Sequence, residues 1–199
     1  MEPGLIPLWS KLTYTLFLCV LVPVYWRCWG PRNFLWFSDV ALLATAVALW
    51  LESPLLASMM TLAIALPETA WNVDFFGRLV AGRQLLGLSG YMFDPRTPLW
   101  LRALSLFHVA LPVVLLVLVA RLGYDRRAWL LQTLFAWLWL PLTFALTGPD
   151  DNVNWVYGPG SRAQTVMPRW LYLVLVMILF PTVIYLPVHL LLGRLLGRS

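Results

Sequence analysis

The chain has 199 residues, of which 61% are hydrophobic and 12% are charged, and its mean hydropathy is +0.78. Soluble domains are nearer half apolar and a quarter charged, so this composition excludes an ordinary soluble domain and predicts a membrane protein. The formal net charge is +5, from fourteen Lys and Arg against nine Asp and Glu. Because the Arg residues fall between apolar runs and no RNA-binding motif accompanies them, we expect contact with lipid headgroups and not with nucleic acid.

Apolar runs of about 20 residues, the length that crosses a bilayer, predict an all-α fold with six transmembrane helices. In chain order they cover residues 12–29, 34–51, 54–75, 99–122, 128–147 and 169–192. We treat residues 1–199 as one transmembrane helical domain. Six helices place both chain ends on one side, here called the near face, and the opposite side is called the far face. Lys and Arg divide six against eight between these faces, which leaves the orientation open.

Two long connections lie on the far face. Residues 76–98 mix Arg78, Arg83 and Gln84 with Leu and Val, which predicts an amphipathic segment lying at the interface. Residues 148–168 are polar and rich in Gly and Pro, which is typical of a loop. Tryptophans near the predicted helix ends are interpreted as interfacial anchors, at positions 29, 36, 71, 100, 129, 155 and 170.

The N-terminal region and the cysteines give two further expectations. The first apolar run is preceded by Lys11 alone and is not followed by a small-residue cleavage site, so we expect no removable signal peptide. Cys19 and Cys28 have neither CxxC nor metal-ligand spacing and predict no disulfide framework.

Polar residues inside the predicted helices gather towards the far face. A charged side chain there costs roughly 2.5–3.5 kcal/mol on insertion scales, so such residues usually face a bundle interior or a wet cavity. Towards this face we place Ser38, Asp39, Glu68, Asn72, Asp74 and His108, and the loop residues Asn152, Asn154 and Tyr157 close over them. The other histidine, His189, lies towards the near face.

Each residue also has a structural interpretation. Asp39 and Glu68 are shallow enough to be interfacial residues that pair with Arg or Trp N–H groups. Asp74 fits a solvated helix-end residue. His108 fits a side chain that hydrogen-bonds a neighbouring helix, and Ser38 fits a small helix residue that bonds its own backbone. The shared depth of the group is what favours a functional site.

This set of side chains suits acyl transfer. A Ser hydroxyl becomes a nucleophile when a His takes its proton and nearby donors hold the developing oxyanion. We therefore predict Ser38 as nucleophile and His108 as general base, with Asp39 or Glu68 orienting the imidazole. The predicted site-shaping groups are Asn72, Asn154 and Tyr157.

Other signatures are missing from the sequence. Gly87-Leu88-Ser89-Gly90 is not a G-x-S-x-G elbow, and there is no Walker loop and no H-E-x-x-H. Asp39, Glu68 and His108 form the alternative O,O,N set for a metal ion, without a paired-histidine signature. We predict no metal and no cofactor.

Three short motifs resemble those of a known group of membrane enzymes. They are Asn33-Phe34-Leu35-Trp36-Phe37-Ser38-Asp39, Phe107-His108-Val109-Ala110-Leu111-Pro112 and Asn154-Trp155-Val156-Tyr157. Their order over residues 30–180 resembles the androgen-induced integral-membrane hydrolases, the related Cys/His transmembrane acyltransferase group and their small six-helix bacterial relatives. Ser38 stands where that group has Cys or Thr. The resemblance implies cleavage or transfer of lipid acyl groups by a hydroxyl nucleophile and a His base without metal, and a bacterial inner-membrane location.

The leading hypothesis is therefore an intramembrane lipid hydrolase or acyltransferase that acts on acyl esters. The alternative is a non-catalytic lipid-binding or assembly protein, in which the same polar groups tie helices together. A small transporter ranks third, because neither repeat halves nor paired broken helices are visible. Membrane lipids are the expected partners, and a homo-oligomer or a membrane-protein partner stays open.

Overall fold

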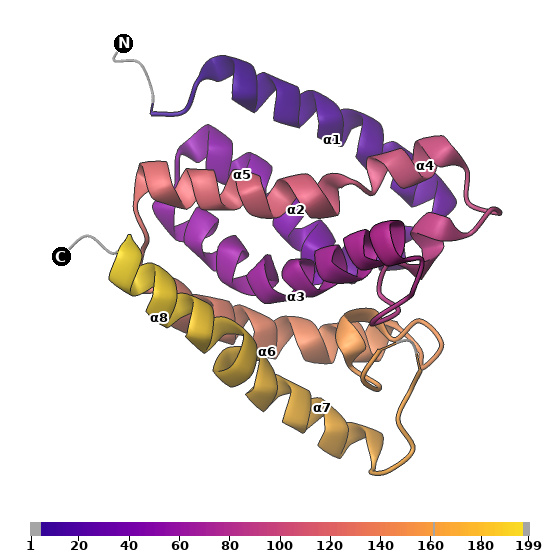
Figure 1. Cartoon of the computed structure of the whole chain (residues 1–199). Helices are drawn as coiled ribbons and strands as arrows, with labels where there is room; N and C mark the ends of the chain where they lie inside the picture. The colour runs from indigo at the N-terminus through magenta and orange to yellow at the C-terminus, as the bar shows by residue number, and fades with distance from the viewer. Residues whose placement is uncertain (1–4, 161, 197–199) are drawn as a thin grey trace.

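The computed structural model describes residues 5–160 and 162–196. These residues form helices joined by turns and loops, with no β-strand among them, as the all-α prediction requires (Figure 1). The start of α1 and the end of α8 lie at one end of the bundle, and the two long connections lie at the other (Figure 1). The near and far faces defined from the sequence are therefore two real ends of the molecule.

The first three long helices are α1 (Leu8–Cys28), α2 (Phe37–Leu51) and α3 (Pro54–Ala81), with the short 3-10 helix η1 (Pro31–Leu35) before α2. The turn between α2 and α3 is short because Glu52 adopts a left-handed conformation, with φ of 47°, and the Ser53 hydroxyl caps α3 by accepting from the Leu56 N–H at 3.3 Å. Pro54 follows at the first helical position, where its missing N–H costs nothing. Helix α3 runs six residues beyond the predicted end at 75, so residues 76–81 belong to it and not to a separate interfacial segment.

The predicted run 99–122 is divided in the structure. It consists of α4 (Leu99–Leu104) and α5 (Phe107–Leu122), separated at Ser105 and Leu106. The preceding connection contains only the 3-10 helix η2 (Gly90–Phe93). The break before α5 places His108 in the first turn of a new helix.

The last part of the chain contains α6 (Ala128–Leu146), η3 (Val153–Trp155), α7 (Arg169–Leu179) and α8 (Leu186–Leu195). A π-helical turn, η4 (Phe180–Tyr185), joins α7 to α8 and contains Pro181. Proline supplies no backbone N–H, and the wider π turn accommodates its ring within a continuous helix.

Helix α3 lies at the centre of the bundle, where it packs against α2, α5 and α6. Helix α1 packs against α2 at the edge and stands apart from α6, α7 and α8 (Figure 1). Buried hydroxyls inside the bundle bond to carbonyls of their own helix, as Thr45 does to Ala41 at 2.6 Å and Thr61 to Ala57 at 2.7 Å. Such local bonds allow polar side chains to sit in an apolar interior.

Four helical segments are long and apolar enough to cross a bilayer: Leu8–Cys28, Leu99–Leu122, Ala128–Leu146 and Arg169–Leu195. Large apolar side chains cover their outer surfaces, among them Trp9, Leu99 and Leu138, which are 71%, 75% and 76% exposed. The chain is therefore an integral, multi-pass membrane protein. Helix α2 has only 15 residues, and α3 carries Glu68, Asp74 and Arg78, so six spans stay a prediction.

Candidate functional site

A cavity of about 340 Å³ opens at the far-face end of the bundle. It lies where the first turns of α2 and α5 meet the second half of α3, under the 82–98 and 147–168 connections. Five of the seven predicted site residues line it: Ser38, Asp39, Glu68, His108 and Asn154. The structure thus brings together residues that lie as far as 116 positions apart in the chain.

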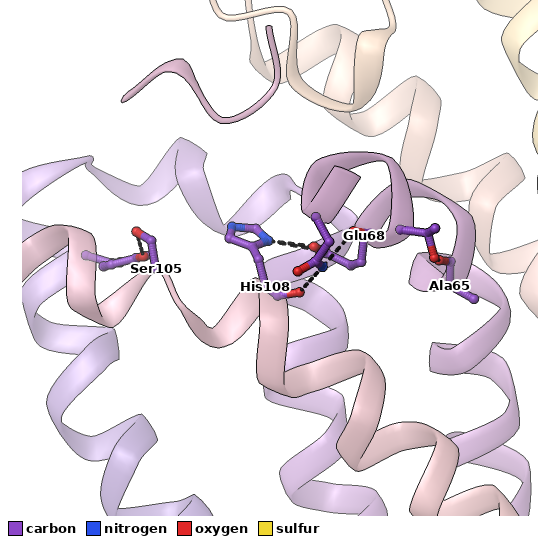
Figure 2. A network of polar contacts seen from close by, with 7 residues as sticks. Ala65, Glu68, Ser105 and His108 are labelled. Carbon is purple, nitrogen blue, oxygen red and sulfur yellow. Dashed lines mark hydrogen bonds and ion pairs between the residues drawn. The ribbon is translucent and has the colours of Figure 1, made fainter. Parts of the chain in front are cut away.

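Glu68 and His108 form the central contact of this cavity. Both Glu68 carboxylate oxygens lie 2.9 Å from Nδ1 of His108, and Figure 2 shows the imidazole of α5 pointing towards Glu68 on α3. A carboxylate only accepts, so Nδ1 carries the proton and Nε2 of the neutral ring keeps a lone pair. The His108 side chain is 14% exposed, and among residues 5–160 and 162–196 none bonds to Nε2. Nε2 is therefore the ring nitrogen without a protein partner among the described residues.

Neighbouring side chains hold the His108 ring in place. Trp71 stacks on it with centroids 4.7 Å apart, and Phe107 does so at 4.0 Å. The Asn72 amide donates to the backbone carbonyls of both Glu68 and His108, each at 2.8 Å. Asn72 therefore ties α5 to α3 through the backbone and acts on the site by positioning, since it does not line the cavity.

Ser38 and Asp39 enter the cavity from the first turn of α2. Asp39 is 3% exposed, and its Oδ1 accepts a hydrogen bond of 3.1 Å from the Asn33 amide. Ser38 is half-buried, and no hydrogen bond of its hydroxyl occurs within the described part of the chain. Ser38 and His108 therefore share a cavity without direct contact, a geometry that is common where substrate completes the hydrogen bonds.

Asn154 serves chiefly to start α2. Its Oδ1 accepts from the Phe37 N–H at 2.8 Å, and its Nδ2 donates to the Leu35 carbonyl at 2.7 Å. The first N–H groups of a helix have no partner inside the helix, so Asn154 supplies one from η3. Its backbone is left-handed, with φ of 53°, which Asn tolerates better than most residues. Its polar atoms are thus already engaged at the cavity wall.

Tyr157 does not line the cavity. Its hydroxyl lies 2.6 Å from the Phe144 carbonyl and 2.8 Å from the Thr147 carbonyl, both at the end of α6. These are the carbonyls that a helix end leaves without partners. Tyr157 therefore fastens the far-face loop to α6.

Asp39 and Glu68 are buried and bond to Asn33 and His108, so the interpretation that they pair with Arg or Trp N–H groups at the interface is wrong. Two further interpretations made from the sequence are wrong. Asp74 is not a solvated helix-end residue, because it is 0% exposed and accepts from the backbone of Leu85, Leu86, Gly87 and Ser89 and from the Ser89 hydroxyl. Trp71 is not an interfacial anchor, because it is 7% exposed and packs on His108. In both cases the 82–98 connection folds back over the end of α3 and excludes solvent from it.

Among the cavity residues that sequence reasoning missed, three carry polar groups close to the predicted site. Tyr25 and Ser105 sit inside apolar runs, yet their hydroxyls lie 2.6 Å apart at the cavity wall. Trp71 lines the same cavity, and its buried Nε1 has no hydrogen-bond partner within residues 5–160 and 162–196. The signal for Ser105 is its position three residues before His108, which places the two on one side of a helical turn.

The alternative metal set is not assembled. Within the described residues no group of three or more His, Cys, Asp or Glu side chains could hold a metal ion, and this includes Asp39, Glu68 and His108. Asp39 is held by Asn33, while His108 Nδ1 is taken by Glu68.

The chain was compared with family models, curated proteins and solved structures. No family model matches the chain, and neither a curated protein nor a solved structure does. The resemblance to androgen-induced integral-membrane hydrolases and Cys/His transmembrane acyltransferases therefore stays a prediction that depends on the three short motifs.

Proposed function

We propose that this protein is an intramembrane hydrolase or acyltransferase that acts on lipid acyl esters, with His108 as general base. The observation that supports the proposal is the hydrogen bond between Glu68 and Nδ1 of His108. Because Nδ1 is the donor in this bond, Nε2 is the nitrogen that can accept a proton, and His108 lines the cavity. A carboxylate at Nδ1 also stabilises the imidazolium that forms when Nε2 takes a proton.

Ser38 is the proposed nucleophile, because it lines the cavity and no other group within the described residues uses its hydroxyl. As its Oγ attacks the ester carbonyl carbon, the proton passes to Nε2 of His108. Collapse of the tetrahedral intermediate breaks the ester bond, and the leaving alcohol takes that proton. Water then releases the acyl group as an acid, or a second alcohol accepts it, with His108 again as base.

Trp71 is the proposed donor to the substrate carbonyl. Its buried Nε1 has hydrogen-bonding capacity that the described protein does not use, and an unused buried donor is costly without a partner. Asn154 and Asn72, which were expected to shape the site, donate their amide N–H groups to backbone carbonyls and not into the cavity. An oxyanion next to Trp71 supplies the missing acceptor.

A second cavity supports a lipid substrate. It has a volume of about 610 Å³ and lies between α1 and α5, where apolar side chains make up most of its wall. Phe107 lines it on one side and stacks on His108 on the other. An acyl chain in this second cavity would bring its ester end close to the base.

A serine-directed fluorophosphonate probe tests the proposal on purified protein. Labelling of the wild type should be lost in Ser38→Ala and His108→Ala and retained in Ser105→Ala, which removes the other cavity serine. Thermal unfolding in detergent checks that each variant is folded. Labelling that survives both Ser38→Ala and His108→Ala would sink the proposal.

One observation favours the non-catalytic alternative, in which the protein binds lipid or assembles with a partner. Asn72 joins α3 to α5 through backbone carbonyls, as a structural tie between membrane helices does. If this is the whole role of the cluster, His108→Ala will lower the unfolding temperature in detergent, while the wild type turns over no lipid ester and takes no probe.

A further inference from the structure

The cavity that holds Glu68 and His108 has unusually aromatic walls. Six of the lining residues are Tyr or Trp, and Phe37 and Phe180 add two more rings. The six are Tyr25, Trp29, Trp36, Trp71, Tyr91 and Trp155. The faces of such rings carry partial negative charge and attract cations, most of all those of Trp.

Two carboxyl groups lie in the wall of the same cavity. Asp39 and Glu68 are each 3% exposed, and no Lys or Arg lines the cavity within the described residues. Glu68 is occupied by His108, but Asp39 accepts only one hydrogen bond, from Asn33 to Oδ1. No donor reaches the second oxygen, Oδ2, in residues 5–160 and 162–196. A carboxyl oxygen that faces a cavity and has no protein partner can pair with a cationic ligand.

We propose that this cavity binds a quaternary ammonium group, as carried by a choline-type lipid headgroup or by a small ammonium compound. A trimethylammonium group has no N–H donors and therefore needs no hydrogen-bond acceptors. Aromatic faces and one carboxylate are enough to bind it, through electrostatic attraction. A primary ammonium has three donors and would leave some of them unpaired in walls that are mostly hydrocarbon. A phosphate alone is disfavoured there, because no Lys or Arg among the described residues lines the cavity. As a statement of substrate class, this inference rests on the proposed function, but binding itself requires no turnover.

Tetramethylammonium is the probe, added to protein in neutral maltoside micelles. Calorimetry and tryptophan fluorescence should show saturable binding that sodium at equal ionic strength does not reproduce. Asp39→Asn should weaken this binding at least tenfold, and Asp94→Asn, the same change at an exposed loop carboxylate paired with Arg96, should leave it unchanged. Trp36→Leu, at a half-buried position in the cavity wall, should also weaken tetramethylammonium binding. This variant replaces Asp39→Asn in the test if Asp39→Asn does not fold.

Equal responses to tetramethylammonium and sodium would overturn the inference, as would full affinity in both folded variants. Tighter binding of ethanolamine than of tetramethylammonium would overturn the preference for a quaternary group.

Competition then identifies the source of the ammonium group. Displacement by a short-chain phosphocholine lipid, but not by the matched phosphoglycerol lipid, assigns the site to a headgroup, and displacement by choline alone assigns it to a free compound. Wild-type protein that binds tetramethylammonium but takes no fluorophosphonate label would refute the hydrolase and keep the ammonium site. Fluorophosphonate labelling without tetramethylammonium binding would refute the ammonium site and keep the hydrolase.

Discussion

The chemistry proposed for His108 depends on one side chain forty residues earlier. Glu68 accepts from Nδ1 and thereby determines which ring nitrogen is basic. Both residues lie in a largely apolar interior, where the charge on Glu68 favours the imidazolium more strongly than it would in water. A neutral side chain of the same shape would keep the hydrogen bond and lose that stabilisation.

Glu68→Gln should therefore lower kcat for ester cleavage by about 10²–10⁴-fold, because the imidazolium loses its counter-charge. The measurement is the rate on a lipid ester together with the rate of fluorophosphonate labelling. Glu52→Gln is the matched control, since Glu52 lies at the near-face turn and bonds to Lys11 instead. Equal losses in the two variants would show that the effect of Glu68 is on folding.

At the scale of elements, one carboxylate holds residues 85–89 of the 82–98 connection. Asp74 receives four backbone N–H donors from residues 85–89 and the Ser89 hydroxyl, at 2.6–3.1 Å. The same connection brings Leu88 and Tyr91 to the cavity wall. Asp74 thus positions the cover of the site without touching it.

Asp74→Asn should destabilise the protein by at least about 2 kcal/mol, because an amide cannot accept all these bonds and adds donors that face other donors. Hydrogen exchange should rise at residues 85–91 and stay low in the middle of α3. Asp94→Asn, in the same connection but exposed beside Arg96, is the control. Unchanged exchange at residues 85–91 would show that other contacts hold the connection.

The near-face end of α1 is joined to the α2–α3 turn by Glu52. Its carboxylate binds Lys11 Nζ at 2.7 Å and accepts from the Leu5 and Ile6 N–H groups at 2.9 and 3.2 Å. The hydrogen bond from Lys11, with those from the backbone, lowers the pKa of Glu52 below its ordinary value of 4.5. The stabilisation is therefore present above pH 4.5 and is lost as the pH falls through the lower pKa of the folded state.

The unfolding temperature of wild type should consequently exceed that of Glu52→Gln at pH 7, and the difference should shrink on acidification below pH 4.5. Thermal melts in detergent between pH 7 and pH 3 measure this difference. A difference that is constant over the whole range would mean that the ionised carboxylate contributes nothing at this turn.

Over the whole molecule, two cavities lie on either side of Phe107, which lines the larger one and stacks on His108 of the other. The far-face cavity has aromatic walls with a few polar groups, while the larger cavity between α1 and α5 is lined mostly by apolar side chains and includes Arg121. Helix α1 stands at the edge of the bundle (Figure 1), and its residues line the larger cavity. In the proposed function, the far-face cavity holds the reacting ester and the larger cavity holds its hydrocarbon chain.

Ala110→Trp should fill part of the apolar cavity, because Ala110 lines it from an exposed position on α5. We expect activity on long-chain esters to fall about tenfold relative to short-chain esters, since only the long chain loses its contacts. Leu116→Trp is the control, on an exposed part of α5 that does not line the cavity. An unchanged ratio of the two activities would remove the acyl chain from this cavity.

Hydropathy alone was enough to predict the membrane class, the helical fold and the end of the bundle where the polar residues gather. Those properties depend on the composition of single segments and on the alternation of direction between successive helices. Ser38, Asp39, Glu68 and His108 could be grouped for that reason. Their depth in neighbouring helices follows from counting residues.

Only the tertiary structure decided what each polar residue contacts. The break at Ser105, the burial of Asp74 and Trp71 under the 82–98 connection, and the use of Asn154 to start α2 have no local signature. Each depends on segments far apart in the chain packing together and satisfying buried donors and acceptors, as Glu68 and His108 do across α3 and α5. Hydropathy is a property of a segment, whereas a hydrogen bond between helices is a property of their packing.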